Sequence, residues 1–543
     1  MLGSIQDLKS APDFDLLIVG AGVAGLIIAN ALDKSPLRVG LLEAGGNRPT
    51  AASRRLYEGE VMQPRIHPGT ARYRVRAAGG TSWVWGGRCI PFDRIDFEKR
   101  DWIDNSGWPI GYDDLAPYYP LANQLLDAGD FSFDPAVSLP DEPAELVAGL
   151  DGDAITTTLE RFSKPTNVWR KLKGSLAVST NVSTFLDCPV ATLLCDEGGR
   201  AATGALVRSP AGEEVLVTAK RVVVCTGGQE TPRLLLLSSL RQNAPFGNTH
   251  DNVGRYYMTH LCATEAILSA APDRLAYDYS RDRDGIYLRR RLWINEAAQR
   301  QHHLLNVTFR THLPAVGNPA HHNGVMSAMY FAKHLVKYEY SRGFGNPEAG
   351  WGTQVQHARN VILGAPQLLG FSTKWIRKRI LAERKLPSVV LPSPQGQYPL
   401  EYHAEQSPVR DSRIGLSSSL DAMGLPKLRV DWHLGERDVD QMVGAHALLR
   451  AQLERSGAGA LTFDEASLRQ RLEVGSVVGG HHIGTTRMSA NPQEGVVDLN
   501  CRVHDMSNLY IAGSSTFATS GQANPTLTIV ALALRLAEHL RAS

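Results

Sequence analysis

The fold is decided by the stretch DLLIVGAGVAG, residues 15–25. A mostly apolar run of strand length leads into Gly20, Gly22 and Gly25, which have the spacing G-x-G-x-x-G. The next residues, LIIANALDK, indicate a helix, and LRVGLLE then indicates a second strand that ends at Glu43. This order predicts a βαβ unit in which the glycines admit a pyrophosphate at the helix N-terminus and Glu43 binds an adenosine ribose. The motif alone does not distinguish NAD from FAD.

Beyond this unit, the chain has further ordered regions separated by a less regular middle. A strand, a turn and a helix follow one another in KRVVVCTGGQETPRLLLLSSL, residues 220–240. Near the C-terminus, Asn524 followed by Pro525 marks the start of a final helix, because Asn suits the N-cap and Pro the first turn. Residues 265–400 contain no clear repeat and mix aromatic, His and Arg residues. This middle region is interpreted as a separate binding layer, and the length of 543 residues favours two domains.

The composition is that of an ordinary globular protein, with 43% hydrophobic and 21% charged residues. The formal net charge of +2 gives no general attraction to nucleic acid or to an anionic membrane. The one dense basic run, Arg289-Arg290-Arg291, is interpreted as a solvated strand edge or a local salt-bridge cluster. No apolar stretch is long enough to span a membrane and no secretory signal is visible, so we expect a cytoplasmic location.

The cysteines and histidines give little sign of a metal centre. None of the six cysteines forms a C-x-x-C motif, and those in apolar strand-like runs, such as Cys225, are interpreted as small buried hydrophobic residues. The stretch GGHHIGTTRMS, residues 479–489, sets His481 beside His482. Neighbours on an extended segment point to opposite faces and no Asp, Glu or Cys stands at ligand spacing, so we predict no metal site at this pair.

Several motifs in a fixed order together resemble the glucose–methanol–choline (GMC) oxidoreductase family of flavoproteins. The resemblance covers roughly the first half of the chain and the last quarter, and it is weakest over residues 265–400. Besides the N-terminal glycine motif, it rests on GGTSWVWGGRC (79–89), SGWPIGYDDLAPYY (106–119), CTGGQETPRLLLLS (225–238), NVGRYYMTH (252–260), HHIGTTRM (481–488) and SSTFATSGQANPTLT (514–528). The motifs HHIGTTRM and GQANPTLT are most similar to those of the pyranose 2-oxidase and gluconate/fructose dehydrogenase branch.

The resemblance implies an α/β protein (α+β overall) in which a Rossmann-like FAD-binding domain is joined to a separate substrate-binding domain on a mostly antiparallel sheet. We expect the FAD-binding domain to comprise residues 12–270 and 472–543, with lid-like segments inserted around 60–180. The substrate-binding domain is then expected to comprise residues 271–471.

The resemblance also favours FAD over NAD. Matched by motif, Val190 would lie near the adenine, residues 79–86 would line the isoalloxazine ring, and the turn at Gly513 would reach the ribityl chain. In several relatives a histidine in the segment that corresponds to residues 79–86 is bonded covalently to the flavin. Here Val84 occupies that place, so we predict non-covalent FAD. Besides Gly20, Gly22, Gly25 and Glu43, the expected cofactor-binding residues are Gly80, Ser82, Val84, Trp85, Gly86, Val190, Gly513, Ser514, Pro525 and Thr526.

The reaction that the family implies is the oxidation of a secondary alcohol to a ketone, in which a base removes the hydroxyl proton while a hydride passes to flavin N5. An imidazole, with an ordinary pKa of about 6.5, suits the role of this base. In the family's HxxGT pattern the functional histidine lies three residues before the glycine, and counting back from Gly484 gives His481. Asn524 would hold the alcohol by donating to its oxygen. His482 is expected to pack or hydrogen-bond beside the base.

Substrate contacts are expected from Gln406, Arg410 and Asp411, with His482 as a further candidate. An equally available interpretation is that the first three residues only pin a loop. The branch points to a sugar, a glycoside or a related cyclic polyol as substrate. Either O2 or a quinone or other carrier could re-oxidise the flavin, so the enzyme could be an oxidase or a dehydrogenase. A flavin-bound lyase, or a tailoring enzyme that acts on a non-sugar alcohol, also remains open, and the sequence does not specify an oligomeric state.

Overall fold

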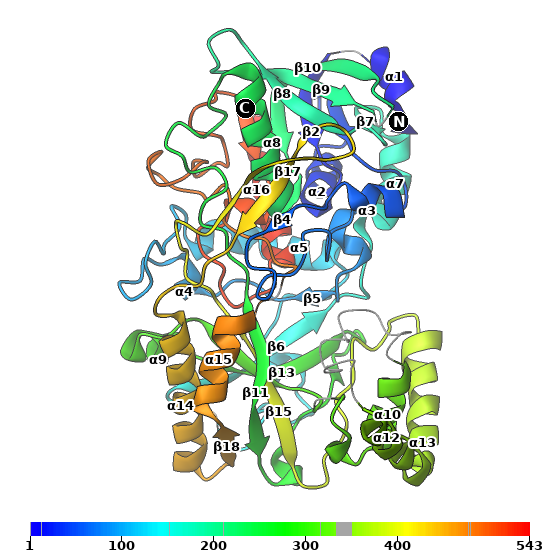
Figure 1. The fold of residues 1–543 in the computed structure, drawn as a ribbon, viewed down its shortest axis with the longest axis vertical. Helices are drawn as coiled ribbons and strands as arrows, with labels where there is room; N and C mark the ends of the chain where they lie inside the picture. Colours follow the sequence, from blue (N-terminus) through cyan, green and yellow to red (C-terminus); the bar gives the residue numbers. More distant parts are fainter. Residues whose placement is uncertain are drawn as a thin grey trace.

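The computed structural model describes residues 2–542 except positions 12, 151, 210, 315, 476 and 478 and the segment 333–349. Among the described residues, the chain forms an upper and a lower part in Figure 1, each built around an eight-stranded sheet. The upper sheet is mostly parallel, and the lower sheet is antiparallel. The predicted α/β class, with a Rossmann-like sheet and a mostly antiparallel second sheet, is confirmed.

The upper sheet has the strand order β1-β7-β3-β2-β10-β9-β8, and β19 pairs with β10. All its pairs are parallel except β10 with β9 and β9 with β8. Its strands are β1 (Leu2–Gly3), β2 (Phe14–Val19), β3 (Val39–Leu42), β7 (Val182–Phe185), β8 (Val190–Cys195), β9 (Ala202–Arg208), β10 (Glu214–Val224) and β19 (Leu509–Ile511). Because β10 lies between β2 and β19, both ends of the chain contribute to one sheet.

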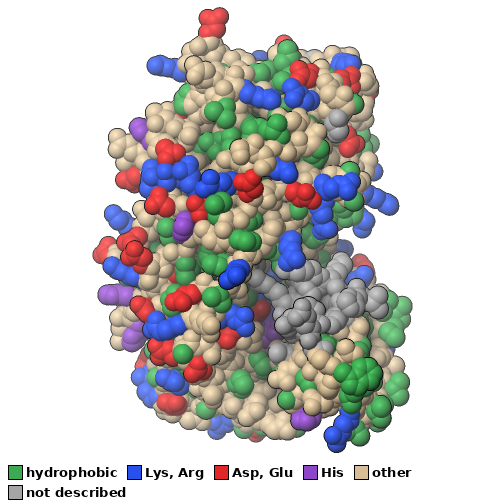
Figure 2. Space-filling model, in the orientation of Figure 1, with side chains coloured by type: hydrophobic (Ala, Val, Ile, Leu, Met, Phe, Trp, Pro, Cys, Tyr) green, Lys and Arg blue, Asp and Glu red, His purple; other side chains and the backbone are tan. Residues whose placement is uncertain are grey.

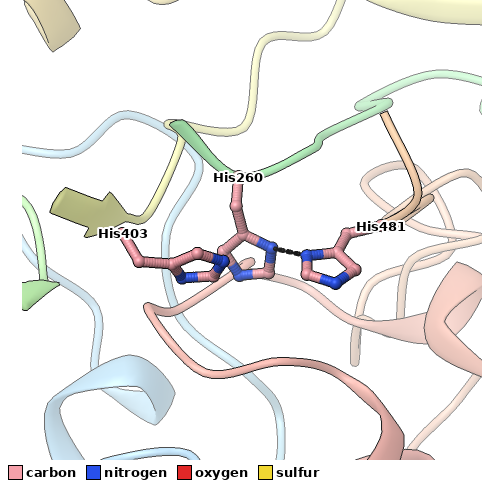
Figure 3. Close-up of side chains that lie close together, drawn as sticks. All are labelled: His260, His403 and His481. Atoms are coloured by element: carbon pink, nitrogen blue, oxygen red, sulfur yellow. Dashed lines mark hydrogen bonds between the residues drawn. The ribbon is translucent and has the colours of Figure 1, made fainter. Parts of the chain in front are cut away.

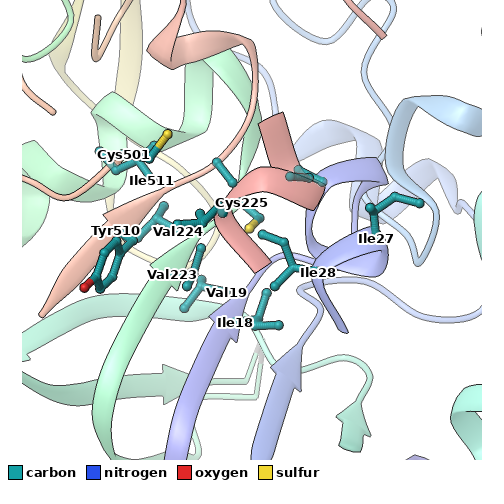
Figure 4. Packing of buried hydrophobic residues seen from close by; sticks show 14 of the residues in the cluster. Ile18, Val19, Ile27, Ile28, Val223, Val224, Cys225, Cys501, Tyr510 and Ile511 are labelled. Atoms are coloured by element: carbon teal, nitrogen blue, oxygen red, sulfur yellow. The ribbon is translucent and has the colours of Figure 1, made fainter. Parts of the chain in front are cut away.

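The predicted βαβ unit consists of β2, helix α2 (Val23–Ala31) and β3. Gly20 has φ +103°, which favours glycine, and a Cβ at Gly25 would lie 2.0 Å from the carbonyl oxygen of Gly20. The unit packs against α16 (Thr526–Ala542), the final helix of the chain. Buried aliphatic side chains of β2, α2, β10 and β19 fill the space between these elements (Figure 4).

The lower sheet has the order β18-β11-β15-β14-β13-β6-β5, and β12 pairs with β13. Its strands are β5 (Arg88–Cys89), β6 (Ile155–Phe162), β11 (Leu261–Ser269), β12 (Ser280–Arg281), β13 (Tyr287–Ile294), β14 (Val307–Thr311), β15 (Gln397–Ala404) and β18 (Ala460–Phe463). Two groups of helices flank it in Figure 1. One group is α9 (Glu296–His302), α14 (Asp438–Ser456) and α15 (Glu465–Gly475), and the other is α10 (Gly324–Phe331), α12 (Trp351–Leu363) and α13 (Ala365–Trp375).

The remaining elements connect or cover the two sheets. A small third sheet contains β4 (Glu60–Val61), β16 (Arg413–Leu420) and β17 (Pro426–Asp431). The other α-helices are α1 (Ile5–Lys9), α3 (Ala51–Arg55), α4 (Arg94–Phe97), α5 (Tyr119–Leu125), α6 (Pro135–Ser138), α7 (Val168–Val178) and α8 (Gly227–Gln242). Two 3₁₀ segments, η1 (Gly80–Trp83) and η9 (Ser514–Thr516), border the cavity described below, and a π-helical turn, η8 (Ile376–Leu381), follows α13.

The predicted domain boundaries do not coincide with the points along the chain where the strands change from one sheet to the other. Strands β5, β6 and β11 precede residue 271 but belong to the antiparallel sheet, so part of the region expected to be lid-like is sheet. Strands β16 and β17 lie within 271–471 but pack against α8. Their pairing partners are distant in the sequence, so local patterns do not reveal them. Residue 12, the predicted start of the first domain, lies outside the described residues.

A buried ion pair joins the first half of the chain to the lower sheet. Arg100 donates to Glu405 through Nη1 at 2.8 Å and through Nη2 at 2.6 Å. The two side chains are 1% and 0% exposed. Because an unpaired charge at such a position is strongly unfavourable, this two-pronged contact fixes the segment after α4 against the end of β15.

The arginine run at 289–291 lies on β13 and is buried, so the solvated-edge interpretation is wrong and the salt-bridge interpretation is right. Arg289 pairs with Glu160, and Arg290 pairs with Glu142 at 3.2 Å.

On the surface seen in Figure 2, basic and acidic side chains are interspersed, and apolar side chains gather at the lower right.

All six cysteines are free, and five of them are buried, as expected for small apolar residues; Cys195 is partly exposed. Within the described part of the chain, no helix is both long enough and apolar enough to cross a membrane.

Candidate active site

A cavity of about 770 Å³ is lined by residues from both sheets. The β2–α2 turn and the end of β3 line it on one side, and strands β13, β14 and β15 line it on the other. Most of the predicted cofactor-binding residues lie on its wall, namely Gly20, Gly22, Glu43, Gly80, Val84, Trp85, Gly86, Val190, Gly513, Ser514, Pro525 and Thr526. The sequence motifs from distant parts of the chain therefore meet around one space.

At the βαβ end, the wall has the features that a dinucleotide requires. Gly22 caps α2 without a side-chain hydrogen bond, and a Cβ there would meet only the Cys225 carbonyl oxygen, at 3.8 Å. The uncapped helix N-terminus thus presents positive potential to the cavity. Arg76 is 8% exposed, lines the same wall, and its Nε has no hydrogen-bond partner. A buried cationic donor without a partner fits a phosphate or another acceptor on a ligand.

Glu43 is held rigidly at this end. Its carboxylate accepts one N–H from Ala21 at 3.0 Å and one from Gly45 at 2.8 Å. Burial raises the pKa of Glu43, while these two backbone donors act in the opposite direction. Each oxygen still has a lone pair that can accept a ribose hydroxyl.

Two predicted cofactor residues, Gly25 and Ser82, do not line the cavity, so their expected direct contact with the cofactor is corrected to a supporting position. Gly25 lies beneath the β2–α2 turn, where a Cβ would collide with the backbone. Ser82 donates to the Gly79 carbonyl at 2.6 Å and accepts from the Val168 N–H at 3.2 Å, so it holds the turn that precedes Val84.

His481 and Asn524 meet on the cavity wall. His481 lies in the segment between α15 and β19, and Asn524 lies directly before α16. Although 43 positions separate them, Asn524 Nδ2 lies 3.1 Å from His481 Nε2, and both residues line the cavity. An imidazole nitrogen and an amide that face one point can hold and deprotonate a hydroxyl group.

Two further histidines, which the sequence analysis did not select, lie against His481 (Figure 3). His260 Nδ1 lies 2.8 Å from His481 Nδ1, and His260 Nε2 lies 3.1 Å from the Ser520 carbonyl oxygen. The His403 ring stacks on His260 with 4.6 Å between centroids, and its Nδ1 contacts the Gln522 carbonyl oxygen at 2.6 Å. Burial lowers the pKa of His260 to about 4 and that of His403 well below its ordinary value.

The antiparallel sheet gives the cavity a charged floor. Arg88, Arg289, Arg310, Glu401 and His403, which lie on four different strands, line it. Arg310 Nε donates to Glu401 at 2.6 Å, across the register pair of β14 and β15.

Behind this floor, Glu160 of β6 is fully buried and pairs with Arg88 Nε at 2.8 Å. Burial opposes its ionisation, but Arg289 and Arg88 lower the pKa of Glu160 to about 2, so it stays charged. Glu401 and His403 stand two positions apart on β15 and therefore share one face of the sheet, and this spacing was a signal that could have identified part of the floor from the sequence.

The prediction that Gln406, Arg410 and Asp411 contact substrate is not supported, because none of them lines the cavity. Gln406 is fully buried, accepts from Thr259 N–H and Trp432 Nε1, and donates to the His433 carbonyl, so its amide pins the chain. Arg410 and Asp411 are exposed, and Asp411 pairs with Arg255 at 2.9 Å. These contacts agree with the other interpretation, in which the residues pin a loop.

His482 borders the cavity but points away from His481's partners. Its Nε2 lies 3.0 Å from the Gly479 carbonyl oxygen, and its ring stacks on Tyr257. Its own carbonyl accepts from Ser514 Oγ at 2.7 Å. Burial lowers the pKa of His482 well below its ordinary value, so it stays neutral. These contacts give His482 a packing role, with no bond to Asn524 among the hydrogen bonds of the described residues.

Comparisons with known proteins agree with this geometry. Residues 408–533 match the family model described as GMC oxidoreductase. The chain is 23% identical to 2-methyl-1,2-propanediol dehydrogenase from Mycolicibacterium austroafricanum, over 98% of this chain and 96% of that protein. It is also 23% identical to the fructose dehydrogenase large subunit from Gluconobacter japonicus, over 97% of each chain.

Among solved structures, pyridoxine 4-oxidase from Mesorbium loti superposes with a TM-score of 0.56 at 16% identity, over 97% of this chain and 98% of that one. This likeness concerns the fold alone. The family model covers the segment that contains both His481 and Asn524, and the dehydrogenase relatives match along nearly the whole chain. Residues 408–533 thus match the GMC oxidoreductase family model, and nearly the whole chain is similar to proteins named as alcohol or sugar dehydrogenases.

Proposed function

We propose that this protein binds FAD non-covalently and oxidises a secondary alcohol of a sugar, a glycoside or a related cyclic polyol to a ketone. The observation that carries the proposal is the 3.1 Å contact between His481 Nε2 and Asn524 Nδ2 on the wall of the cavity that the dinucleotide motif also lines. Base, hydroxyl-binding amide and cofactor cradle are thus parts of one space.

The cavity residues fit FAD. Gly22 and the N-terminus of α2 would receive the pyrophosphate, Glu43 would bind the adenosine ribose, and Val190 would lie by the adenine. The segment around Val84 and the N-terminus of α16 at Thr526 would border the isoalloxazine ring. When bound, FAD supplies the electron acceptor for the hydride that leaves the alcohol carbon.

The protein's own residues supply binding, orientation and proton transfer. Asn524 donates to the substrate oxygen and holds the hydroxyl against His481. His481 takes the hydroxyl proton as the carbon–hydrogen bond breaks. The charged floor formed by Arg88, Arg310 and Glu401 offers donors and acceptors side by side, as a substrate with several hydroxyls requires.

The substrate class rests on this floor and on the relatives. Two similar proteins are named for dehydrogenation of fructose and of a propanediol, both of which carry more than one hydroxyl. Anaerobic mixing of the purified flavoprotein with a panel of sugars, glycosides and cyclic polyols tests the proposal. We expect at least one of them to bleach the visible flavin band and to yield a ketone. Conversion of a substrate with the flavin remaining oxidised would instead indicate a lyase.

The re-oxidant is tested with the same panel in air. We propose that O2 or a carrier such as a quinone accepts the electrons. Peroxide formation in step with ketone would identify an oxidase. Bleaching that persists in air and reverses on addition of a quinone would identify a dehydrogenase.

Non-covalent attachment of FAD has its own test. Residues 79–89 contain no histidine, and Val84 has no group that could form a bond to the flavin. Precipitation of the holoprotein with acid is therefore expected to leave a colourless pellet and a yellow supernatant. A yellow pellet after washing would contradict this prediction.

A further inference from the structure

Three histidines, His260, His403 and His481, lie with one ring nitrogen of each within 4.8 Å of the others (Figure 3). They come from distant parts of the chain, at the start of β11, near the end of β15 and in the segment before β19. The proposed function uses only His481. The roles of the other two follow from the hydrogen bonds that the three rings make.

The donor and acceptor of each hydrogen bond can be assigned by starting at the Ser520 carbonyl oxygen. The carbonyl oxygen of Ser520 can only accept, so His260 Nε2, at 3.1 Å, must carry a hydrogen. His260 is buried and neutral, because burial lowers its pKa to about 4. A neutral imidazole has one N–H, so His260 Nδ1 carries a lone pair. His481 Nδ1, 2.8 Å away, must then be the donor to it.

The other end of the chain of hydrogen bonds gives the same assignment. Arg88 Nη1 donates to Asn524 Oδ1 at 3.4 Å, which turns the amide nitrogen of Asn524 toward His481. Asn524 Nδ2 donates to His481 Nε2 at 3.1 Å, so Nε2 carries a lone pair. All four bonds run in one direction, from the Arg88 cation to the Ser520 carbonyl.

We propose that His260 is a positioning residue that fixes His481 as the Nδ1–H tautomer, so that Nε2 keeps its lone pair. Without substrate this lone pair accepts from Asn524. When an alcohol binds, its hydroxyl replaces the Asn524 N–H as the donor to Nε2, and Asn524 donates to the alcohol oxygen. This inference rests on the proposed function of His481 as the base. On proton transfer, a bond forms between Nε2 and the hydroxyl hydrogen as the O–H bond breaks. The Nδ1–H remains in place and donates to His260 while His481 carries the positive charge.

His403 serves this arrangement by stacking. Its ring lies against His260, its Nδ1 donates to the Gln522 carbonyl, and it makes no hydrogen bond to His481 among those of the described residues. A neutral ring on this side keeps His260 in a position where its Nδ1 reaches His481. His403 and His260 thus hold the base from behind, and Asn524 and Arg88 hold it from the cavity side.

A metal ion is a poorer explanation of the same cluster. Two nitrogens bound to one tetrahedral zinc at about 2.0–2.1 Å lie roughly 3.3 Å apart, whereas the His260 and His481 nitrogens are at hydrogen-bond distance, 2.8 Å. The neighbouring Arg88 and Arg310 disfavour added positive charge at His403. Both observations favour a shared proton over a cation.

NMR of the holoprotein labelled with ¹⁵N-histidine measures the tautomer of His481 without any substrate. The His481 signals are assigned from their loss in His481→Ala. We expect a protonated Nδ1 and an unprotonated Nε2 in the wild type. In His260→Phe, which keeps a ring but removes the acceptor, we expect a mixture of tautomers. In His260→Asn, whose Oδ1 can replace Nδ1 as acceptor, we expect the wild-type tautomer.

Kinetics on the same variants supply the second readout. We expect His260→Phe to lower kcat by roughly ten- to a hundredfold with little change in KM, because the lost hydrogen bond is strongest when His481 is charged. His260→Asn should recover most of this loss. His446→Phe is the matched control, since His446 is also buried with a pKa lowered to about 4 by burial, but its ring packs on Phe309 and Tyr402 and its Nδ1 contacts the Met442 carbonyl oxygen.

An Nε2–H tautomer of His481 in the wild type would overturn the proposal. So would a wild-type tautomer and kcat in His260→Phe. Stoichiometric binding of Zn²⁺ that shifts the signals of all three histidines would replace it with a metal site. If no alcohol reduces the flavin, the proposed function fails, but the NMR result still decides whether His260 sets the tautomer.

Discussion

His481→Ala is expected to slow reduction of the bound flavin by an alcohol substrate by about 10²–10⁴-fold, the usual contribution of a general base. The physical reason is that His481 Nε2 is the nitrogen that meets Asn524 on the cavity wall. Anaerobic stopped-flow mixing measures this rate directly. The visible spectrum of the variant before mixing checks that FAD is still bound.

The adjacent residue provides the matched control. His482→Ala should retain most of the wild-type rate, because the His482 ring bonds to the Gly479 carbonyl and stacks on Tyr257. Some loss of stability is expected, since a buried ring is removed. If His482→Ala abolished flavin reduction while His481→Ala retained it, the assignment of the base would be reversed.

Two glycines of the N-terminal motif are expected to respond differently to the same substitution. Gly22→Ala adds a methyl group with open space around it, so the apoprotein should unfold near the wild-type temperature. FAD affinity should fall roughly tenfold or more, because the new methyl group stands where the pyrophosphate approaches the helix, and such overpacking costs about 1–3 kcal/mol.

Gly25→Ala places its Cβ 2.0 Å from the Gly20 carbonyl oxygen. This collision involves the protein alone, so the free energy of unfolding of the apoprotein should fall by about 1–3 kcal/mol or more. Thermal unfolding of both apoproteins and titration with FAD separate the two effects. Wild-type FAD affinity in Gly22→Ala would contradict the placement of the pyrophosphate at this turn.

The sequence predicted those parts of the site that local motifs encode. The βαβ order and its glycines predicted the β2–α2 turn, because strand, turn and helix adjoin in the chain. His481 and Asn524 were selected from short motifs that resemble a family, and the structure brings them together. Their catalytic roles stay predictions until the variants are measured.

The parts that the sequence did not predict depend on pairing between distant strands. His403 and the floor arginines reach the cavity, and His260 reaches His481, only because β11, β15, β14 and β13 adjoin in one sheet. Gln406 was misplaced for a related reason. Its amide is occupied by the backbone of Thr259 and by Trp432, and neither partner is near it in the sequence. The sequence did not place β5 and β6 in the antiparallel sheet because β6 pairs with β13, more than a hundred residues later, and β5 pairs with β6, about seventy residues later.

The central claim is that an alcohol held between His481 and Asn524 loses its carbon-bound hydrogen to the FAD in this cavity. The most direct test is anaerobic single-turnover mixing of the holoprotein with its best substrate, unlabelled or carrying deuterium at the alcohol carbon. The account predicts that both forms bleach the flavin and that the deuterated form does so several times more slowly. Consumption of the substrate while the flavin band stays unchanged would contradict the account.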